Sequence, residues 1–413
     1  MGKHMAPASS VTLLLTLCFL VGLRAAAQVG AAGAGAPLPA PSGPHALGTV
    51  AFRLVDTAEL SSRTRLIRPL AVRVFYPAVA GTGNGPVPYV DGNLLDSMAA
   101  NKYLEEPEAE MRDWKSIRLA ARRDAKPEAP PIHAGWPVVI FSHGFGVSSA
   151  HYAALGQELA SRGYVILSVD HPYGGFALAP DGSLLVPGRD SLRLRRRVDS
   201  LDDSVDSTLA WLVKRWAHEG VLAVRRAAAF AVDARPGWRL RLNTTRVAMI
   251  GHSLGGAAAL QACRDEPMIR ACIDMDGQPV GDVERFGVGK PFLTLLSQPA
   301  RRTTSPKDSA EARQRQEFAA MGRARDSMWT AIMARHPDVP SFVIAIEGTG
   351  HMTFSDAPFE LPAQLVGVGA TLRPAEAYSL VIGYVVAFLD HVLRGRASTL
   401  KPGLLHRTLP PDQ

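Results

Sequence analysis

Short apolar runs alternate with longer segments of helical periodicity from Trp136 onward. The runs are rich in β-branched residues and lack the polar alternation of half-exposed strands, so they predict strands that are buried on both faces. They are PVVIF (137–141), YVILSV (164–169), RVAMI (246–250), ACIDM (271–275), PFLTLLS (291–297) and SFVIAI (341–346). The helical patterns cover residues 151–162, 198–216, 254–264, 308–335 and 376–394. This alternation predicts an α/β fold with a mostly parallel, doubly wound sheet that is flanked by helices.

The first part of the chain is less regular. Two strand-like segments, 49–55 and 70–76, precede a charged stretch, 103–125, which has helical character. We interpret this stretch as part of a surface excursion over about residues 85–135, and a second excursion covers about 299–340. We expect residues 48–400 to form a single domain that includes both excursions, and residues 401–413 to form a tail.

The N-terminus has the pattern of a secretory signal. Lys3 precedes a 13-residue apolar run, Val11–Leu23, and the following AAA offers a cleavage site. The run is shorter than a typical membrane span, although an uncleaved anchor is the open alternative. We expect a signal peptide over residues 1–27, a flexible Ala/Gly/Pro-rich leader over residues 28–47, and a secreted or periplasmic protein.

The composition is mildly basic. The net charge is +7, and residues 1–27 hold two of the basic residues and no acidic one, so the mature chain would attract anionic surfaces only weakly. A dense basic patch, 193–197, is followed by four aspartates and has no interleaved aromatic residues, which favours a solvated helix start over a nucleic-acid or phospholipid site. We expect no nucleic-acid partner, leave a transient contact with a lipid surface open, and infer no oligomeric state.

The sequence Gly251-His252-Ser253-Leu254-Gly255 directly follows one predicted strand and directly precedes a predicted helix. This arrangement is the nucleophile elbow of α/β-hydrolases. A side chain at either glycine would meet neighbouring backbone in so tight a turn, and the strain exposes the serine hydroxyl. The amides that begin the helix point to where negative charge develops. Ser253 is therefore the candidate nucleophile.

A serine nucleophile needs a base, and the chain order in this fold is serine, then acid, then histidine. Of the 12 histidines, four follow the elbow. His336 precedes a predicted strand, His391 lies inside the last predicted helix, and His406 is in the tail. His351 follows a predicted strand on the glycine-rich loop GTGHM, so it is the candidate base.

Two aspartates, Asp274 and Asp276, lie at the end of the run ACIDM. Asp276 stands at the strand end, where Gly277 turns the chain, and the next strand end offers no nearby carboxylate. We therefore expect Asp276 to orient His351 and to stabilise its protonated form. Glu347 is the competitor, but it is too close to His351 along the chain to face it easily. Asp274 is expected to be buried and hydrogen-bonded, and no role is assigned to it.

The segment SHGFG (142–146) ends another predicted strand. A His-Gly turn at this place supplies the second amide of an oxyanion hole. The backbone N–H groups of Phe145 and Leu254 are therefore the candidate donors. His143 is expected to brace the turn rather than to carry protons, because the base role is filled.

Weaker signals surround these residues. Tyr173, in the turn DHPYGG (170–175), and Phe354 and Phe359, after the base, are candidate substrate contacts together with His143. A capping turn is the alternative for Tyr173, and packing of the last helix is the alternative for the two phenylalanines. No group of residues has metal-ligand spacing, so no metal or cofactor is expected.

Cys263 and Cys272 are the two cysteines that follow the signal segment. They flank a predicted helix-to-strand turn, and we expect an exported protein to join them in a disulfide. Two buried free thiols are the alternative.

With these motifs in this order, the chain from about Leu70 to Leu393 resembles the platelet-activating factor acetylhydrolase family, in its plasma, type II and bacterial forms. The resemblance lies in LAVRVFYP, WPVVIFSHGFG, VDHPYGG, GHSLGG, the Asp276 position and GTGHMTFSD. It implies an α/β-hydrolase fold, a triad of Ser253, Asp276 and His351, and the oxyanion amides of Phe145 and Leu254. Members of this family hydrolyse short or oxidised acyl esters of phospholipids without calcium.

These observations favour a secreted serine esterase that acts on an ester or phospholipid substrate through an acyl-enzyme, with short-acyl or sn-2 esters as the preferred class. A general carboxylesterase, a cutinase-like polyester hydrolase or a lipase would share the same apparatus. An acyltransferase or a non-catalytic binding protein is a more distant alternative, because a binding protein has no use for a strained, exposed serine.

Overall fold

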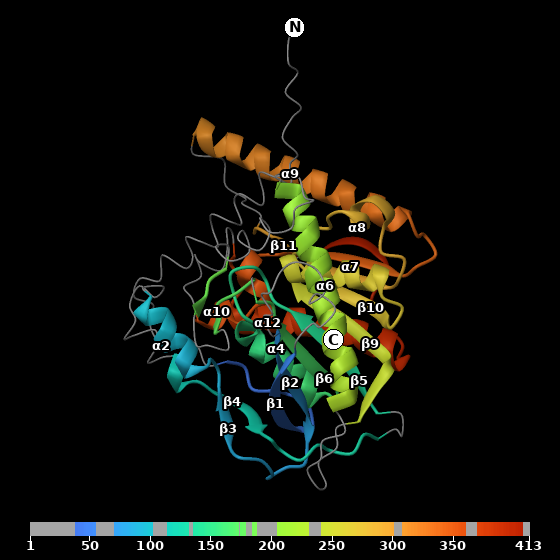
Figure 1. Cartoon of the computed structure of the whole chain (residues 1–413). Coiled ribbons are helices and arrows are strands. Elements are labelled where there is room, and N and C mark those ends of the chain that lie inside the picture. Colours follow the sequence, from blue (N-terminus) through green and yellow to red (C-terminus); the bar gives the residue numbers. More distant parts are fainter. Residues whose placement is uncertain are drawn as a thin grey trace, which may run out of the picture.

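The structure is a computed structural model that describes residues 38–54, 70–101, 114–131, 135–172, 174–178, 184–187, 205–230, 241–300, 308–360 and 370–407 (Figure 1). Its described part is built on an 11-stranded sheet. In spatial order the strands are β13 (Gly403–Arg407), β12 (Ser341–Glu347), β11 (Phe292–Gln298), β10 (Ile269–Met275), β9 (Leu242–His252), β5 (Trp136–Ser142), β6 (Val165–Asp170), β2 (Leu70–Ala78), β1 (Ala46–Leu54), β4 (Arg118–Arg123) and β3 (Pro86–Pro88). All six apolar runs expected to be strands are strands of this sheet.

Neighbouring strands from β13 to β6 are parallel. Beyond β6 the sheet becomes mixed, since β2 is antiparallel to both β6 and β1. The register aligns the ends of three central strands, because Ser142 of β5 lies opposite Gly251 of β9, and Gly251 lies opposite Asp274 of β10. The segments that follow these strands therefore meet at one edge of the sheet, as expected for the crevice of a doubly wound fold.

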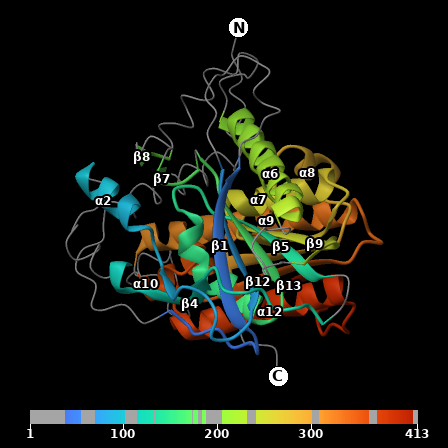
Figure 2. The same cartoon turned by 60° about the horizontal axis from the view of Figure 1, so that its bottom comes forward.

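Helices cover both faces of the sheet (Figure 2). One face carries α6 (Val205–Phe230), α7 (Leu254–Asp265), α8 (Asp282–Phe286) and α9 (Ser309–Ala334). The other carries α2 (Gly92–Ala100), η2 (Ser149–Tyr152), α4 (Ala153–Ser161), η3 (His351–Phe354), α10 (Ala357–Glu360) and α12 (Pro374–Arg394). A small hairpin of β7 (Ala177–Leu178) and β8 (Leu184–Leu185) lies outside the sheet. The expected α/β architecture is confirmed.

Three expectations about the periphery are wrong. Residues 118–123, expected to be helical, form β4, in which Leu119 and Ala121 are buried, Arg118 and Arg123 are exposed and Arg122 is half-buried. The last part of the expected flexible leader is ordered, because Ser42 bonds to Glu158 of α4 and β1 begins at residue 46. Residues 403–407, expected in a tail, form the edge strand β13.

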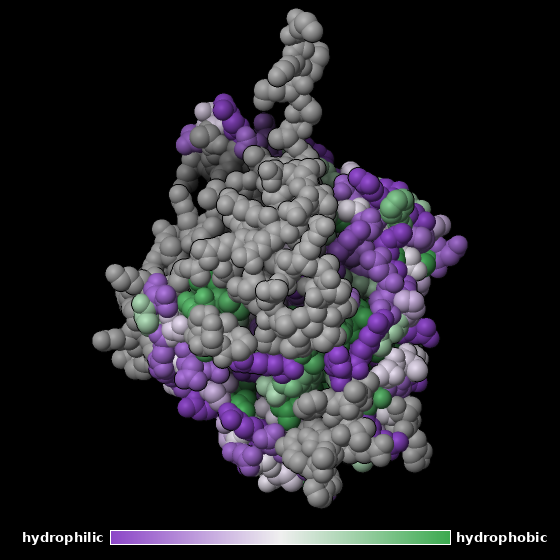
Figure 3. Space-filling view, in the orientation of Figure 1, coloured by the Kyte–Doolittle hydropathy of each residue, from purple (hydrophilic) through white to green (hydrophobic). Residues whose placement is uncertain are grey.

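The helix α12 is, within the described residues, the one that is long and apolar enough by composition to cross a membrane. Half of its most apolar window is buried against the sheet, including Val385, Phe388 and Leu389, so a place in the protein core accounts for its composition. On the face drawn in Figure 3, the described surface is mainly hydrophilic, with small hydrophobic patches.

Candidate active site

Ser253 occupies the strained turn between β9 and α7. Its backbone dihedral φ is +55°, a conformation that non-glycine residues rarely adopt. The two glycines of the motif are required by close backbone contacts: a Cβ at Gly251 would lie 2.0 Å from the carbonyl oxygen of Gly255, and a Cβ at Gly255 would lie 2.3 Å from that of Ser142. Backbone strain held in place by surrounding structure is typical of functional sites. The residue expected as nucleophile therefore lies in the expected elbow.

Asp276 lies one residue beyond the end of β10 and is also strained, with φ of +57°. Its Oδ2 accepts hydrogen bonds from His351 Nδ1 and from Ser297 Oγ, each at 2.7 Å. Its Oδ1 accepts a third, at 2.7 Å, from the backbone N–H of Ser297. Burial alone would raise the pKa of Asp276, but the hydrogen bonds from His351 and Ser297 outweigh this effect and lower the pKa to about 2. Asp276 is therefore a carboxylate that faces His351.

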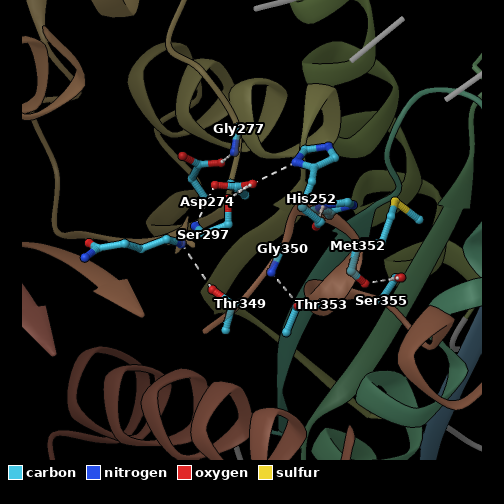
Figure 4. Close-up of polar contacts among 12 residues, drawn as sticks. His252, Asp274, Gly277, Ser297, Thr349, Gly350, Met352, Thr353 and Ser355 are labelled. Atoms are coloured by element: carbon cyan, nitrogen blue, oxygen red, sulfur yellow. Dashed lines mark hydrogen bonds and ion pairs between the residues drawn. The ribbon is translucent and has the colours of Figure 1, made fainter. Parts of the chain in front are cut away.

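His351 begins the short helix η3, directly after β12. The loop that carries it is fixed from both sides: Gly350 N–H donates to Thr353 Oγ1 at 2.9 Å, and the backbone N–H of Gly348 donates to the carbonyl of Gln298 at the end of β11 (2.8 Å). Figure 4 shows Gly350, Thr353 and Ser355 gathered around this turn. The imidazole of His351 is 30 % exposed, whereas the carboxylate of Asp276 is 12 % exposed. The imidazole of His351 is thus partly exposed and is held by its hydrogen bond to Asp276.

Asp274 is fully buried under the elbow, as expected. Its Oδ1 accepts a hydrogen bond of 2.8 Å from the N–H of Gly277 (Figure 4). The same oxygen lies so close to Gly256 that a Cβ there would be 2.0 Å away. Burial raises the pKa of Asp274 well above its ordinary value, and nearby Asp276 acts in the same direction. The pKa values of the two aspartates are thus shifted in opposite directions, which favours a neutral Asp274 and an ionised Asp276.

The candidate oxyanion turn after β5 is packed against the elbow. A Cβ at Gly144 would lie 3.4 Å from Cβ of Ser253, so the turn passes directly beside the serine. The N–H of Gly144 donates to Tyr152 Oη at 3.1 Å. Phe145 follows Gly144 and is half-buried, and Leu254 is the first residue of α7, whose first amides have no partner within the helix. The two candidate donors therefore lie in the turns on either side of Ser253.

His252, the residue before Ser253, links these turns. Its Nδ1 accepts a hydrogen bond from Tyr152 Oη at 2.7 Å, and its Nε2 donates to the carbonyl of His351 at 2.9 Å. Burial lowers the pKa of His252 to about 3, and the neighbouring His351 acts in the same direction. The ring is therefore neutral, which allows it to accept at one nitrogen and donate at the other.

The candidate substrate contacts have different outcomes. His143 is fully buried and bonds to the backbone of Gly144 and His171, so the structure gives it the bracing position instead of a contact surface. Phe354 and Phe359 are 3 % and 6 % exposed and lie against α12, which is the position that the alternative, packing of the last helix, predicts for them. Tyr173 lies outside the described residues.

The expected disulfide is corrected. Cys263 and Cys272 are free, buried thiols at the contact between α7 and β10. Burial raises the pKa of Cys272 well above its ordinary value, and a hydrogen bond with the Cys263 side chain acts in the same direction. The two cysteines are therefore free thiols packed in the core, which was the alternative interpretation.

Three residues of the site were missed by the sequence reasoning: Ser297, Tyr152 and His252. Ser297 is the last-but-one residue of β11 and supplies two of the three hydrogen bonds to Asp276. Its position at a strand end was the available signal. Tyr152 carried no such signal, because it lies in η2 and reaches His252 across 100 residues of sequence. Among the described residues, no group of three or more His, Cys, Asp or Glu side chains could hold a metal ion.

Comparisons with known proteins agree with this geometry. A probable 1-alkyl-2-acetylglycerophosphocholine esterase of Arthroderma benhamiae is 23% identical over 338 residues, which is 78% of this chain and 76% of that one. A platelet-activating factor acetylhydrolase of Cavia porcellus is 24% identical over 301 residues, 68% of this chain. That match spans 62% of the Cavia protein, less than two thirds of its length.

Among solved structures, a ferulic acid esterase from Streptomyces cinnamoneus has a similar fold. Its TM-score is 0.61 at 27% sequence identity, with 89% of this chain and 95% of the other covered. The sequence model of the family described as platelet-activating factor acetylhydrolase, isoform II, matches residues 32–174 and 238–398. The matched segments contain both candidate oxyanion turns, the elbow, Asp276 and His351. The chain therefore belongs to the platelet-activating factor acetylhydrolase, isoform II, family.

Proposed function

We propose that this protein is an exported serine esterase that hydrolyses carboxylic esters of short acyl groups, including sn-2 esters of phospholipids. The observation that carries the proposal is the 2.7 Å contact between His351 Nδ1 and Asp276 Oδ2 beside the strained elbow of Ser253. The family membership and the names of the relatives, which are esterases, support the reaction class.

In the proposed mechanism, Ser253 Oγ attacks the ester carbonyl and His351 takes the serine proton. Asp276 holds the imidazole by its Nδ1–H, so that Nε2 is the basic nitrogen, and the carboxylate stabilises the imidazolium that forms. The N–H groups of Phe145 and Leu254 stabilise the negative charge on the tetrahedral oxygen. His351 then protonates the leaving alcohol, and a water molecule, activated in the same way, hydrolyses the acyl-enzyme.

A feruloyl ester is the second candidate substrate. It is favoured by the fold similarity to a ferulic acid esterase, which extends over 95% of that chain. A bulky aromatic acyl group and a short aliphatic one place different demands on the acyl side of the crevice, so a substrate panel separates them.

The test is hydrolysis of p-nitrophenyl acetate, butyrate and palmitate, methyl ferulate, and phospholipids with sn-2 acetyl or long acyl chains, by the wild type and by Ser253→Ala. We expect turnover of the short esters by the wild type and a loss of about 10⁴-fold or more in the variant. Equal rates for the two proteins would refute a serine mechanism. Preference for palmitate would indicate a lipase, and preference for methyl ferulate a feruloyl esterase.

Export is a separate part of the proposal and rests on the signal pattern of residues 1–27. After expression of the full chain in a secreting host, the protein outside the cytoplasm should begin at Gln28. N-terminal sequencing measures this directly. Retention of residues 1–27 on a membrane-bound product would indicate the uncleaved anchor instead.

A further inference from the structure

A second hydrogen-bonded series of serine, histidine and carboxylate side chains lies in the protein interior, one strand away from the proposed triad. Ser142 Oγ is 2.8 Å from Nε2 of His171, and Nδ1 of His171 is 2.7 Å from Oε2 of Glu219. The three residues are 0 %, 1 % and 2 % exposed. No ester reaches side chains that are buried to this degree, so this series is not a second active site. Its role must be exerted through the residues that it holds.

Helix α6 fixes the far end of this series. Glu219 accepts a hydrogen bond of 2.8 Å from Arg215, one turn earlier on the helix. Burial alone would raise the pKa of Glu219, but Arg215 and the hydrogen bond from His171 outweigh this effect and lower it. The ring of Trp216 stacks on His171, with centroids 4.2 Å apart and planes 4° from parallel. Glu219 is therefore an ionised acceptor, to which His171 Nδ1 donates, and the imidazole of His171 has one fixed orientation.

His171 reaches the oxyanion turn at two points. Its ring bonds to Ser142, the last residue of β5, and its backbone N–H donates to Nε2 of His143 at 3.0 Å. Because Nε2 of His143 is an acceptor, the proton of the neutral ring is on Nδ1. Burial, with His171 acting in the same direction, lowers the pKa of His143 to about 4 and keeps the ring neutral. His143 Nδ1 accordingly donates to the carbonyl of Gly144 at 2.7 Å.

This last hydrogen bond sets the direction of the proposed oxyanion donor. The carbonyl of Gly144 and the N–H of Phe145 belong to the same peptide unit. A trans peptide is planar, and its C=O and N–H point in opposite directions. When His143 fixes the carbonyl of Gly144, it therefore also fixes the N–H of Phe145. Donors that are oriented before the reaction stabilise a developing oxyanion more than donors that must reorganise.

We propose that Glu219 is a positioning residue for the oxyanion hole. Through His171 and His143 it fixes the plane of the Gly144–Phe145 peptide, so that the N–H of Phe145 is held toward the tetrahedral oxygen. The inference rests on the proposed esterase function, but it concerns residues on α6 and directly beyond the end of β6 that take no part in the proton transfers.

The main test is Glu219→Gln. A glutamine offers one acceptor and one N–H₂ group where Arg215 and His171 both donate, so one of the two hydrogen bonds is lost. Removal of a whole oxyanion donor costs about 10²–10³-fold in kcat, so we expect misorientation of one donor to lower kcat by about 10- to 100-fold. KM should change by less than about threefold, because the donor acts mainly in the transition state. Affinity for a trifluoromethyl ketone, which forms a tetrahedral adduct with the serine, should fall in proportion to kcat.

Glu158→Gln is the matched control. Glu158 is also a buried glutamate on a helix, 2 % exposed, and it bonds to Arg162 one turn away at 2.6 Å. It contacts Ser42 instead of the oxyanion turn. Its substitution should lower Tm without lowering kcat. A second variant, Ser142→Ala, removes one hydroxyl of the series and should reproduce the fall in kcat, to a smaller extent, in a folded protein.

The outcomes distinguish a failure of the proposed esterase function from a failure of the positioning role of Glu219. Turnover by the wild type that Ser253→Ala abolishes establishes the esterase, and its absence refutes the proposed function itself. Given that turnover, the positioning role is overturned by a folded Glu219→Gln protein with kcat within about twofold of the wild type. Equal losses in Glu219→Gln and Glu158→Gln would also overturn it, since they indicate general destabilisation. If Glu219→Gln does not fold, unchanged kcat and inhibitor affinity in Ser142→Ala decide against the proposal.

Discussion

His252 donates a hydrogen bond from Nε2 to the backbone carbonyl of His351, at 2.9 Å. On its other side it accepts from Tyr152 Oη, which in turn accepts from the N–H of Gly144. This series of hydrogen bonds joins the turn of the proposed nucleophile to the turn of the proposed base and to the oxyanion turn. A neutral His252 is needed for this double role, and its pKa of about 3 leaves it neutral throughout the range in which esterases work.

Tyr152→Phe should therefore lower catalysis more than stability. The variant removes one hydroxyl and leaves Gly144 N–H and His252 Nδ1 buried without their partner, at a cost of about 1–3 kcal/mol for each group. Part of this energy is recovered by movement of the turns, which displaces the donor and the base. We expect kcat for p-nitrophenyl butyrate to fall about 10-fold, with KM nearly unchanged, in steady-state assays.

Tyr164→Phe is the control for this prediction. Tyr164 is also fully buried and its hydroxyl donates to Asp390 at 2.6 Å, far from the elbow. It should lower Tm to a similar extent and leave kcat intact. If both variants lose activity equally, the Tyr152–His252 chain has no special part in catalysis.

Asp276→Asn should remove most turnover while the fold survives. Asparagine has an N–H₂ group in place of one carboxylate oxygen, so it cannot accept all three hydrogen bonds that Asp276 accepts. It also favours the wrong tautomer of His351. The corresponding substitution in a serine protease triad costs about 10⁴-fold in kcat, and we expect a loss of that order here. Asp390→Asn, at a carboxylate that also has several partners, should keep kcat within about twofold. Full activity of Asp276→Asn would remove this residue from the proposed triad.

The stability of the protein should also depend on Asp276 at low pH. Its pKa is about 2 in the folded protein and near 3.8 in the unfolded chain, so the carboxylate stabilises the fold fully above pH 4. As the pH falls, the unfolded chain binds the proton first, and the contribution of about 2 kcal/mol disappears as the pH approaches 2. Urea unfolding of the wild type and Asp276→Asn between pH 7 and pH 3 measures this. The difference between the two proteins should shrink below pH 4, and a difference independent of pH would contradict a hydrogen-bonded carboxylate at Asp276.

The sequence was sufficient to predict the central strands, because apolar runs of five to seven residues that are buried on both faces have little alternative in an α/β fold. It failed at β4, where three arginines, Arg118, Arg122 and Arg123, hide the short alternation of the buried Leu119 and Ala121 with more exposed residues. It failed at β13 as well, a five-residue edge strand that exists by pairing with β12. Short strands near sheet edges are specified by their partners more than by their own composition.

The same distinction applies to the site. Ser253, Asp276 and His351 were predicted from strand ends, a local feature of the sequence. The partners that fix them were not, because Ser297 meets Asp276 and Tyr152 meets His252 only after the sheet has formed. Glu219 is hidden in the same way, because it lies on α6 beyond the end of the helical pattern predicted over residues 198–216. Side-chain hydrogen bonds between distant segments need the register of the sheet, which a single sequence does not specify.

The two cysteines allow a direct chemical test. Cys263 and Cys272 are both fully buried free thiols, so iodoacetamide should not label them in the folded protein. After unfolding in guanidinium without reductant, both Cys263 and Cys272 should react, as detected by mass spectrometry of their peptides. Labelling that appears only after addition of a reductant would show a disulfide and would contradict the free pair. Protein recovered after the proposed export is the sample to use, because an oxidising compartment would give a disulfide the opportunity to form.

Asp274→Asn should change stability with a pH dependence opposite to that of Asp276→Asn. The folded protein holds Asp274 neutral, so the stability that this group contributes is complete below the ordinary aspartate pKa and is lost as the pH rises toward its folded pKa. An asparagine keeps the acceptor for Gly277 N–H and does not titrate. The variant should therefore gain stability relative to the wild type as the pH rises above about 4, by up to about 1.4 kcal/mol per pH unit, and retain most turnover. Urea unfolding over this range, beside the kinetics of both variants, measures the two aspartates together. If Asp274→Asn abolished turnover while Asp276→Asn did not, the acid of the proposed triad would be assigned to the wrong residue.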